Sequence, residues 1–413
     1  MAGLIKKIPD TSDWRADFPI MQKTMNGKPL AYLDSASSAQ KPQAVIDTMT
    51  GVMETHYANV HRGLYEFSQT TTAAFEKARE KVAGFIGAQG REIVFTRNAT
   101  EAINLVAASW GAAFLKSGDE IILTELEHHA NIVPWQLLRG KTGVMLKTIP
   151  VKRDGTLDLD SYKALLSPRT KLVAFTHVSN VLGTINPVKQ IVEMAKANNA
   201  RTLTLVDGSQ GVVHSAVDVR ELGCDFYVFT GHKLYGPTGI GVLWGQYDVL
   251  EKMPPYQGGG DMIERVAFEE TTFKEPPARF EAGTPAIVEA ICLGVAIDYI
   301  EAIGRAAIAA QERELLAYAM TKLEAVDGLT FYGRAADKAG IISFTADWGH
   351  ASDIGMILNQ CGVAVRVGHH CCMPLMARLG VEATVRASLG LYSNEADVDA
   401  LVKGLLKAKE LLS

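Results

Sequence analysis

Between about residues 75 and 245 the sequence alternates short apolar runs with helical patterns, and this alternation constrains the fold more than any other feature. The runs are rich in β-branched and aromatic residues, which favour strands: EIILTEL, KLVAFTHV, TLTLVDGS, FYVFTG and GIGVLWG. Strands that alternate with helices predict an α/β fold with a mostly parallel, doubly wound sheet. Ligands of such sheets bind beyond the carboxyl ends of the strands, so polar residues at those ends are candidates for a site.

A second, smaller α/β pattern follows a helical stretch over residues 287–326. Its strand candidates are LTFYG, IISFTAD and VAVRVG, and it closes with an amphipathic helix. Asn394 is the expected N-cap of that helix, and the apolar face comprises Val398, Leu401, Val402, Leu405 and Leu406. Because 413 residues exceed the size at which one core keeps growing, we expect two domains. The large domain is predicted over 25–290, and a smaller C-terminal domain over 1–24 and 291–413.

Composition excludes several classes of protein. With 41 Lys and Arg against 46 Asp and Glu, the chain offers no basic field, so nucleic acid is not expected as a partner. The most apolar stretch, residues 287–300, is interrupted by Glu289 and Asp298, so no membrane span is expected. The N-terminus lacks the apolar core of a secretory signal, and we expect a cytoplasmic protein. Gly- and Pro-rich segments at 254–260 and 276–285 predict long, functional loops.

Asp207 and Lys233 lie 26 positions apart (233 − 207) at the ends of two consecutive strand candidates. A lysine beside glycines can form an imine with an aldehyde cofactor, and an aspartate can keep a pyridine nitrogen protonated. Either residue alone is more simply a turn or surface residue. Together at neighbouring strand ends they indicate pyridoxal phosphate.

Several other polar residues flank the same strand ends. Thr230 and His232 adjoin the lysine and would suit a phosphate, and Thr100 opens a helical pattern whose amides could bind the same group. A simple helix cap is the alternative for Thr100. His128 and His129 follow another strand, where an imidazole could stack on a cofactor ring and move protons, although such a pair is more often structural.

The segment VRVGHHCCMPL, residues 365–375, has two interpretations. Four adjacent ligand-type residues suggest a metal site, but neighbouring residues cannot easily converge on one ion, since spacings of two to five residues are usual. Alternatively, Arg366 and the two histidines hold Cys371 partly as a thiolate, which is the form that attacks sulfur. We favour the nucleophile and expect no metal. The five cysteines lack paired spacing, so reduced thiols are expected, and the other four are expected to be buried and inert.

Arg386 lies at the end of an apolar run, where a guanidinium requires a partner. Its fork geometry suits a substrate carboxylate, and an internal ion pair is an almost equal alternative.

Taken in order, the segments YLDSASSAQKP, NVHRG, ELEHHANIVPWQ, HVSNVLGT, VDGSQ, TGHKLYGPTGIG, RFEAGTP, RVGHHC and RASLGLY resemble cysteine desulfurases of the SUF-type, or group II, branch of the class V aminotransferase family. The resemblance runs from about Trp14 to the C-terminus. It implies a fold-type I pyridoxal phosphate enzyme that forms a homodimer, with the active site at the subunit boundary.

The resemblance also implies roles for single residues. Lys233 would bond covalently to the cofactor, Asp207 would pair with its pyridine nitrogen, His128 would stack on its ring and Gln210 would contact its phenolic oxygen. The phosphate would be held by Thr100, Thr230, His232 and, from the partner subunit, Thr284. Asn180 and Arg386 would bind the substrate carboxylate. Cys371 would carry the persulfide with Arg366 nearby, and Cys372 departs from the family, which commonly has a small residue such as alanine there.

The implied reaction converts L-cysteine to L-alanine and an enzyme persulfide. A small sulfur-acceptor protein of the SufE or SufU type would then receive the sulfur for iron–sulfur cluster assembly by the SUF machinery. Two alternatives on the same scaffold are a selenocysteine lyase and a class V aminotransferase. A third is a non-catalytic metal or iron–sulfur scaffold that uses the HHCC run.

Overall fold

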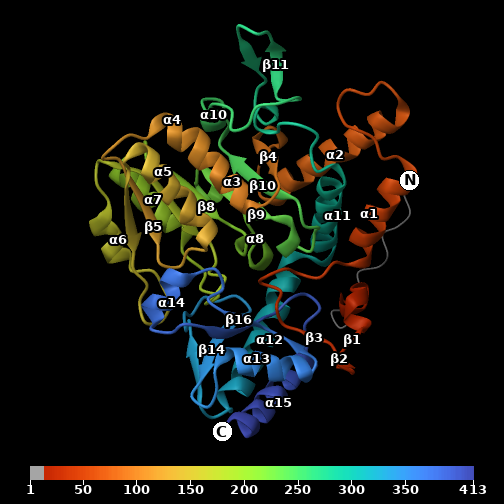
Figure 1. The fold of residues 1–413 in the computed structure, drawn as a ribbon, viewed down its shortest axis with the longest axis vertical. Helices are drawn as coiled ribbons and strands as arrows, with labels where there is room; N and C mark the ends of the chain where they lie inside the picture. The colour runs from red at the N-terminus through yellow and green to blue at the C-terminus, as the bar shows by residue number, and fades with distance from the viewer. Residues whose placement is uncertain (1–13) are drawn as a thin grey trace.

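The computed structural model describes residues 14–413 (Figure 1). Its strands form a seven-stranded sheet, a four-stranded sheet and three two-stranded sheets. The large sheet has seven strands in the order β4 (Ile93–Thr96), β10 (Gly241–Gly245), β9 (Phe226–Thr230), β8 (Leu203–Asp207), β7 (Thr170–Thr176), β5 (Glu120–Thr124) and β6 (Met145–Ile149). Neighbouring strands from β9 to β6 are parallel, and only β10 runs antiparallel to its neighbours. The predicted sheet is therefore present, with all five predicted strands in it.

Both faces of this sheet are buried, which explains the continuous apolar runs. Along β7, Val173 and Phe175 pack into one core, whereas Leu172 and Ala174 pack into the other. Side chains of a strand alternate between its two faces, so a strand buried on both sides needs apolar residues at every position. Edge strand β6 is largely exposed and lacks such a run, which is why its sequence did not predict it.

Helices cover both faces. On one side α3 (Ala99–Val106) packs on β9 and β10, and on the other α11 (Ile287–Ile303) packs against α1 (Gln43–Thr55) and α2 (Glu66–Phe85). The other helices of this part are α4 (Ala112–Phe114), α5 (Val133–Thr142), α6 (Leu159–Leu165), α7 (Val188–Asn198), α8 (Gly211–His214), α9 (Val219–Leu222) and α10 (Tyr247–Leu250). A hairpin of β11 (Ile263–Val266) and β12 (Thr271–Phe273) projects at the top of Figure 1, between the two predicted loop segments.

The small sheet is antiparallel, in the order β13 (Leu329–Tyr332), β14 (Ile341–Ala346), β17 (Thr384–Ser388) and β16 (Arg366–Gly368). The run VAVRVG divides between this sheet and a parallel pair formed by β15 (Val363–Ala364) and β3 (Ala31–Tyr32). Its helices are α12 (Arg305–Glu324), α13 (Ala351–Gln360), α14 (Met373–Leu379) and α15 (Glu395–Leu412), and a short hairpin of β1 (Thr24–Met25) and β2 (Lys28–Pro29) lies near the N-terminus.

The bounds of the two predicted domains stay a prediction. Strand β3 pairs with β15 although residues 31–32 fall in the range assigned to the large domain, and α11 runs across position 290. The expected contribution of residues 1–13 to the small domain lies outside the described residues.

The C-terminal helix α15 largely matches its prediction. Asn394 caps it, because its Oδ1 accepts a hydrogen bond from Asp397 N–H at 3.1 Å, and the Asp397 carboxylate accepts from Asn394 N–H in return. Val398, Leu401 and Leu405 are buried as expected. The prediction is wrong for Leu406, which is 52% exposed because it lies beyond the edge of the buried stripe.

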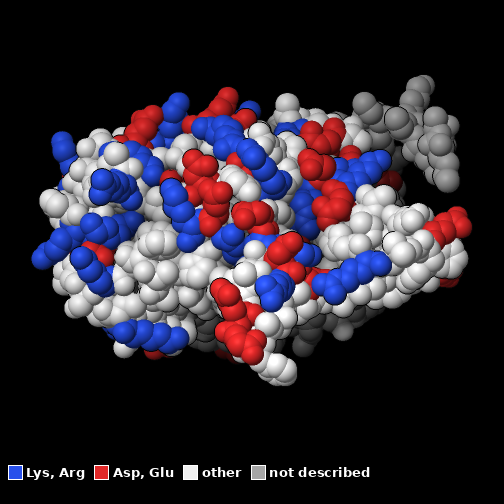
Figure 2. Space-filling model, turned by 90° about the horizontal axis from the view of Figure 1, so that it is seen from above, with Lys and Arg blue, Asp and Glu red and all other residues white. Residues whose placement is uncertain are grey.

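The surface carries charges of both signs. Figure 2 shows basic and acidic side chains interspersed over the upper face of the molecule. Among the helices of residues 14–413, none combines the length and the apolar character that crossing a membrane requires.

We predict that Asn394→Ala lowers the free energy of unfolding by about 1 kcal/mol, because the first turn of α15 loses its side-chain acceptor. Thermal and urea unfolding measure the change. Asn394→Asp is the matched control and should retain the stability, since a carboxylate accepts the same bond and interacts favourably with the helix N-terminus. Equal losses in both variants would contradict a capping role.

Candidate active site

A cavity of about 180 Å³ lies beyond the carboxyl ends of the parallel strands. The chain continues from β5 to β6 on one side and then to β7 on the other, so the strand order reverses beside β5, which is where such sheets bind ligands. Most of the predicted residues line this cavity: Thr100, His128, Asn180, Asp207, Thr230, His232, Lys233, Arg366, Cys371 and Arg386.

Lys233 and Asp207 enter the cavity from neighbouring strands. Asp207 is the last residue of β8, and Lys233 ends the short turn η6 (Gly231–Lys233) that follows β9. Burial lowers the pKa of the Lys233 amine, and the Asp207 carboxylate opposes that shift. A lowered pKa makes the neutral, nucleophilic amine easier to reach near neutral pH.

Three of the four residues predicted to hold a phosphate, Thr100, Thr230 and His232, line the cavity. Thr230 Oγ1 is buried and has no hydrogen-bond partner among the described residues, so its hydroxyl can bond to a ligand. Thr100 lies in the first turn of α3, whose N-cap Asn98 accepts from Glu101 N–H at 2.9 Å. The start of α3 packs tightly on β10, because a Cβ at Gly241 would lie 2.4 Å from the Asn98 backbone. An orphaned hydroxyl beside a helix N-terminus fits an anionic group.

His128 is held as a neutral ring. Its Nδ1 accepts a hydrogen bond from Ala130 N–H at 3.1 Å, which leaves the ring proton on Nε2. Burial and then the nearby Lys233 lower the pKa of His128 to about 4. The ring is therefore neutral near pH 7 and can donate from Nε2.

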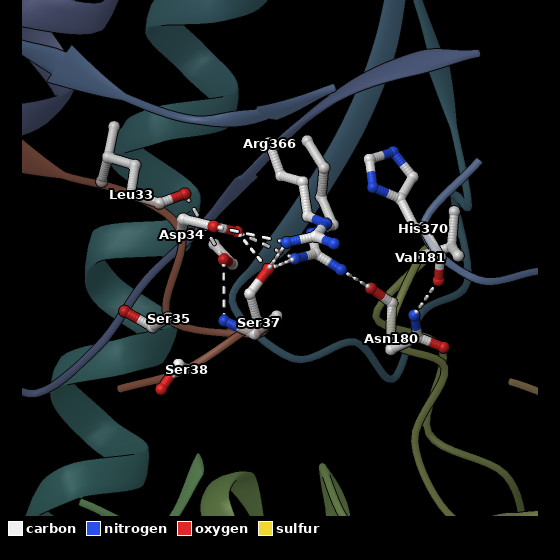
Figure 3. Close-up of polar contacts among 12 residues, drawn as sticks. Leu33, Asp34, Ser35, Ser37, Ser38, Asn180, Val181, Arg366 and His370 are labelled. Atoms are coloured by element: carbon white, nitrogen blue, oxygen red, sulfur yellow. Dashed lines mark hydrogen bonds and ion pairs between the residues drawn. The ribbon is translucent and has the colours of Figure 1, made fainter. Parts of the chain in front are cut away.

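Arg386 belongs to a polar network with Asp34, Ser37 and Asn180, and these three partners are labelled in Figure 3. Its Nη1 donates to Asn180 O at 2.8 Å, and its Nη2 donates to Asp34 Oδ1 at 3.0 Å and to Ser37 Oγ at 2.8 Å. Arg366 Nη1 donates to the same Ser37 hydroxyl at 3.0 Å. Arg386 is only 2% exposed and its Nε–H lacks a partner within residues 14–413, so it retains a donor for a ligand. The internal ion pair considered from the sequence is present as well.

The two adjacent cysteines differ sharply. Cys371 is partly exposed and lines the cavity. Cys372 is fully buried, its Sγ donates to Asn180 Oδ1 at 3.2 Å, and burial raises its pKa to about 12. A thiol with that pKa stays protonated near neutral pH, so Cys371 is the thiol placed to react.

Asn180 is engaged by the segment that carries both cysteines. Besides accepting from Cys372, its Nδ2 donates to His370 O at 2.9 Å. Both ends of the amide are therefore engaged within the chain, but Nδ2 carries two N–H groups and the bond to His370 O uses only one of them.

Of the two histidines before Cys371, His370 does not provide the positive charge expected of it. His370 Nε2 lies 2.8 Å from Thr384 Oγ1, and burial together with Arg386 lowers the pKa of His370 to about 3. His369 Nδ1 accepts from Cys371 N–H at 3.1 Å. Both histidine rings take part in hydrogen bonds within the chain. The arginines that line the cavity are Arg366 and Arg386, and they carry the positive charge near Cys371.

Gln210 and Thr284 do not line the cavity of this chain. Gln210 Nε2 donates to Ala36 O at 2.8 Å, one residue behind the cavity wall. Thr284 lies in a separate cavity of about 280 Å³ with Thr96 and Gly283. Its predicted role in a partner subunit stays a prediction.

Three contributors were not assigned from the sequence. Asp34 and Ser37, within DSAS, pair with Arg386, and buried Glu127 precedes His128. Burial raises the pKa of Glu127 to about 8, and its carboxyl accepts bonds from Thr124, Asn131 and Thr176. The only signal was their place inside quoted motifs, since a single acid or serine has many structural uses.

The HHCC run does not form a metal centre in this part of the chain. Its side chains diverge toward Thr384, Asn180 and the loop backbone, and residues 14–413 contain no group of three or more His, Cys, Asp or Glu side chains that could hold an ion.

The model of the Aminotransferase class-V family matches residues 31–401. The chain belongs to this family. A cysteine desulfurase of Dickeya dadantii is 52% identical over 400 residues, which cover 96% of each chain. One of Serratia proteamaculans is 51% identical over 96% of this chain and 98% of its own. These matches confirm the predicted family and enzyme class, with pyridoxal phosphate as the cofactor of that class.

Solved structures agree. The cysteine desulfurase CsdA from Escherichia coli superposes with a TM-score of 0.91 at 38% identity, covering 98% of this chain and 100% of that one. A cysteine desulfurase from Thermococcus onnurineus NA1 also gives 0.91, at 37% identity, over 100% and 99% of the two chains. The predicted α/β, fold-type I architecture is confirmed. The SUF-type branch stays a prediction, because these names do not specify it.

We predict that iodoacetamide labels Cys371 in the native protein while Cys372 and Cys292 remain unmodified, because burial raises the pKa of both inert thiols to about 12. Raising the pH toward that value should increase their thiolate fraction, whereas lowering it should not. Peptide mapping by mass spectrometry measures the labelling, with urea-unfolded protein as the control in which all three react. Preferential labelling of Cys372 would contradict the assignment.

Proposed function

We propose that this chain is a cysteine desulfurase that converts L-cysteine to L-alanine and leaves the sulfur as a persulfide on Cys371. The observation that carries the proposal is a single cavity that combines a desolvated lysine, an aspartate at the next strand end and a partly exposed cysteine. Relatives of about half-identical sequence that bear this name support it.

Pyridoxal phosphate fits the residues present. Thr230, Thr100 and His232 would hold the phosphate, Asp207 would face the pyridine nitrogen, and His128 would lie against the ring. Gln210 would contact the phenolic oxygen after leaving Ala36 O, and Thr284 of a second copy would complete the phosphate site. The bound cofactor supplies an electron sink that weakens bonds at the substrate Cα.

The substrate carboxylate would bind at Arg386. The free Nε–H of that buried guanidinium is a fixed donor in a dry environment, where a charge-assisted bond is strong. Asn180 would add a second donor, and Arg366 would keep the cavity mouth positive.

Lys233 and Cys371 would perform the chemistry. Lys233, held partly neutral by desolvation, takes the proton from the substrate Cα at its Nζ. The Cys371 thiolate attacks the substrate sulfur, so that the Cβ–S bond breaks as an S–S bond forms. The remaining carbon fragment takes up protons and leaves as L-alanine.

The finer predictions belong to the same proposal. The enzyme would act in the cytoplasm as a homodimer. A small sulfur-acceptor protein of the SufE or SufU type would receive the persulfide sulfur for the SUF machinery of iron–sulfur cluster assembly.

We predict that Lys233→Ala lowers turnover of L-cysteine by about 10²–10⁴-fold, because the proton acceptor is lost. Borohydride reduction of the wild-type holoenzyme should attach the cofactor to the peptide that contains Lys233. Lys41→Ala is the control, because Lys41 does not line the cavity and its amine donates to the backbone oxygen of His232. This variant should keep the covalent attachment of the cofactor to Lys233. Cofactor found on another lysine would contradict the central assignment.

We predict that Cys371→Ser forms no persulfide after exposure to L-cysteine, whereas Cys372→Ala still does, because only Cys371 reaches the cavity. Mass spectrometry of the trapped peptide locates the additional sulfur. Sulfur on neither cysteine of the wild-type protein would overturn the desulfurase proposal and favour another reaction on this scaffold.

A further inference from the structure

Residues 369–373, here called the cysteine loop, have an unfavourable backbone. His370 and Cys371 are consecutive non-glycine residues with φ values of 51° and 57°. Residues other than glycine rarely adopt this left-handed backbone conformation. The loop therefore keeps it only if contacts with surrounding residues stabilise it.

His129 contacts the loop on both sides of Cys372. Its backbone N–H donates to Cys371 O at 2.7 Å, and its ring Nε2 accepts from Met373 N–H at 3.0 Å. Among the described residues that lie outside the loop and α14, only His129 forms hydrogen bonds with the backbone of both Cys371 and Met373. The His129 ring also lies beside that of His369, with centroids 5.6 Å apart.

The ring bond satisfies a group that helix α14 cannot satisfy itself. Met373 is the first residue of α14, and the first amides of a helix lack partners within it. The N-cap Cys372 provides no side-chain acceptor, because its thiol points to Asn180. His129 therefore supplies from another segment the acceptor that a capping side chain would normally supply.

The segment that carries His129 is itself anchored. Glu127 accepts hydrogen bonds from Thr124 of β5, from Asn131 and from Thr176 N–H of β7. The next residue, His128, lines the cavity, and His129 turns to the cysteine loop. Residues 127–129 thus connect the cavity wall to the cysteine loop.

The ring bond exists only while His129 is neutral. Nε2 can accept from Met373 N–H only with an unprotonated lone pair, which places the ring proton on Nδ1. The titratable side chains beside the ring are His369 and His128, whose ring centroids lie 5.6 Å and 6.3 Å from that of His129. Burial and then His369 lower the pKa of His129, so the neutral form is favoured in the fold.

We propose that His129 is a positioning residue: its neutral imidazole holds the cysteine loop so that Cys371 meets the substrate sulfur. This inference rests on the proposed function. Since the folded state disfavours the proton, the bond is complete above the ordinary histidine pKa of about 6.5 and is lost as the pH falls below it.

Two variants separate the acceptor from the ring. His129→Ala removes the acceptor and leaves the backbone bond to Cys371, whereas His129→Gln offers an amide oxygen at similar reach that does not titrate. Persulfide formation on Cys371 is measured in single turnovers between about pH 5.5 and 8. Hydrogen exchange of the peptide containing residues 371–376 is measured in parallel and does not depend on the reaction.

We expect His129→Ala to slow persulfide formation about tenfold at pH 8, in keeping with the loss of one hydrogen bond, with an unchanged KM and faster exchange in the loop peptide. His129→Gln should recover most of the rate and should lose less activity than the wild type at low pH. His350→Ala is the matched control, because His350 also accepts a backbone N–H, from Ser352, but lies outside the cavity. It should leave the rate unchanged.

Wild-type rates and unchanged exchange in His129→Ala would overturn the inference while leaving the proposed function intact. Failure of His129→Gln to recover either quantity would also overturn it, because the acceptor would not be what matters. Absence of persulfide in the wild type would instead overturn the proposed function, and the cofactor absorption of each protein shows whether cofactor binding was retained.

Discussion

The burial of both faces of the seven-stranded sheet is the constraint on which the rest of the structure depends. Helices cover both faces, so the inner strands are mainly apolar and many of the polar side chains lie where the strands end. Asp207, Thr230 and Lys233 lie at such ends, and the reversal of strand order beside β5 opens a cavity between them. The site is therefore a consequence of how the core is covered.

The small sheet completes the cavity through a buried charge. Arg386 on β17 carries its guanidinium into the protein, where an unpaired charge would be costly, and Asp34, Ser37 and the carbonyl of Asn180 pair with it. These partners come from the N-terminal segment and from the loop after β7. The same interactions that stabilise the guanidinium thus join three distant segments around the place where a substrate carboxylate would lie.

Sequence reasoning predicted the elements that have a strong local signal. The five apolar runs became strands, and Asn394 became an N-cap, because core burial and capping act over a few residues. Strand β6 at a partly exposed edge, and strand β17 with its mixed polar and apolar sequence TVRAS, lacked such a signal. The helical stretch at 287–326 divides at Gly304, whose φ of 94° ends α11 and lets α12 begin in a new direction.

The sequence by itself determined the fold class, the family and most of the residues that gather in the cavity, since strand periodicity and ordered motifs are properties of the chain. Only the tertiary structure decided how two residues that are adjacent in the sequence differ in their roles. Cys371 and Cys372 are adjacent and chemically identical, yet one lines the cavity and the other is buried against Asn180. His128 and His129 likewise turn to the cavity and to the cysteine loop. Burial and hydrogen-bond partners come from segments distant in sequence, and these set the pKa and the role of each side chain.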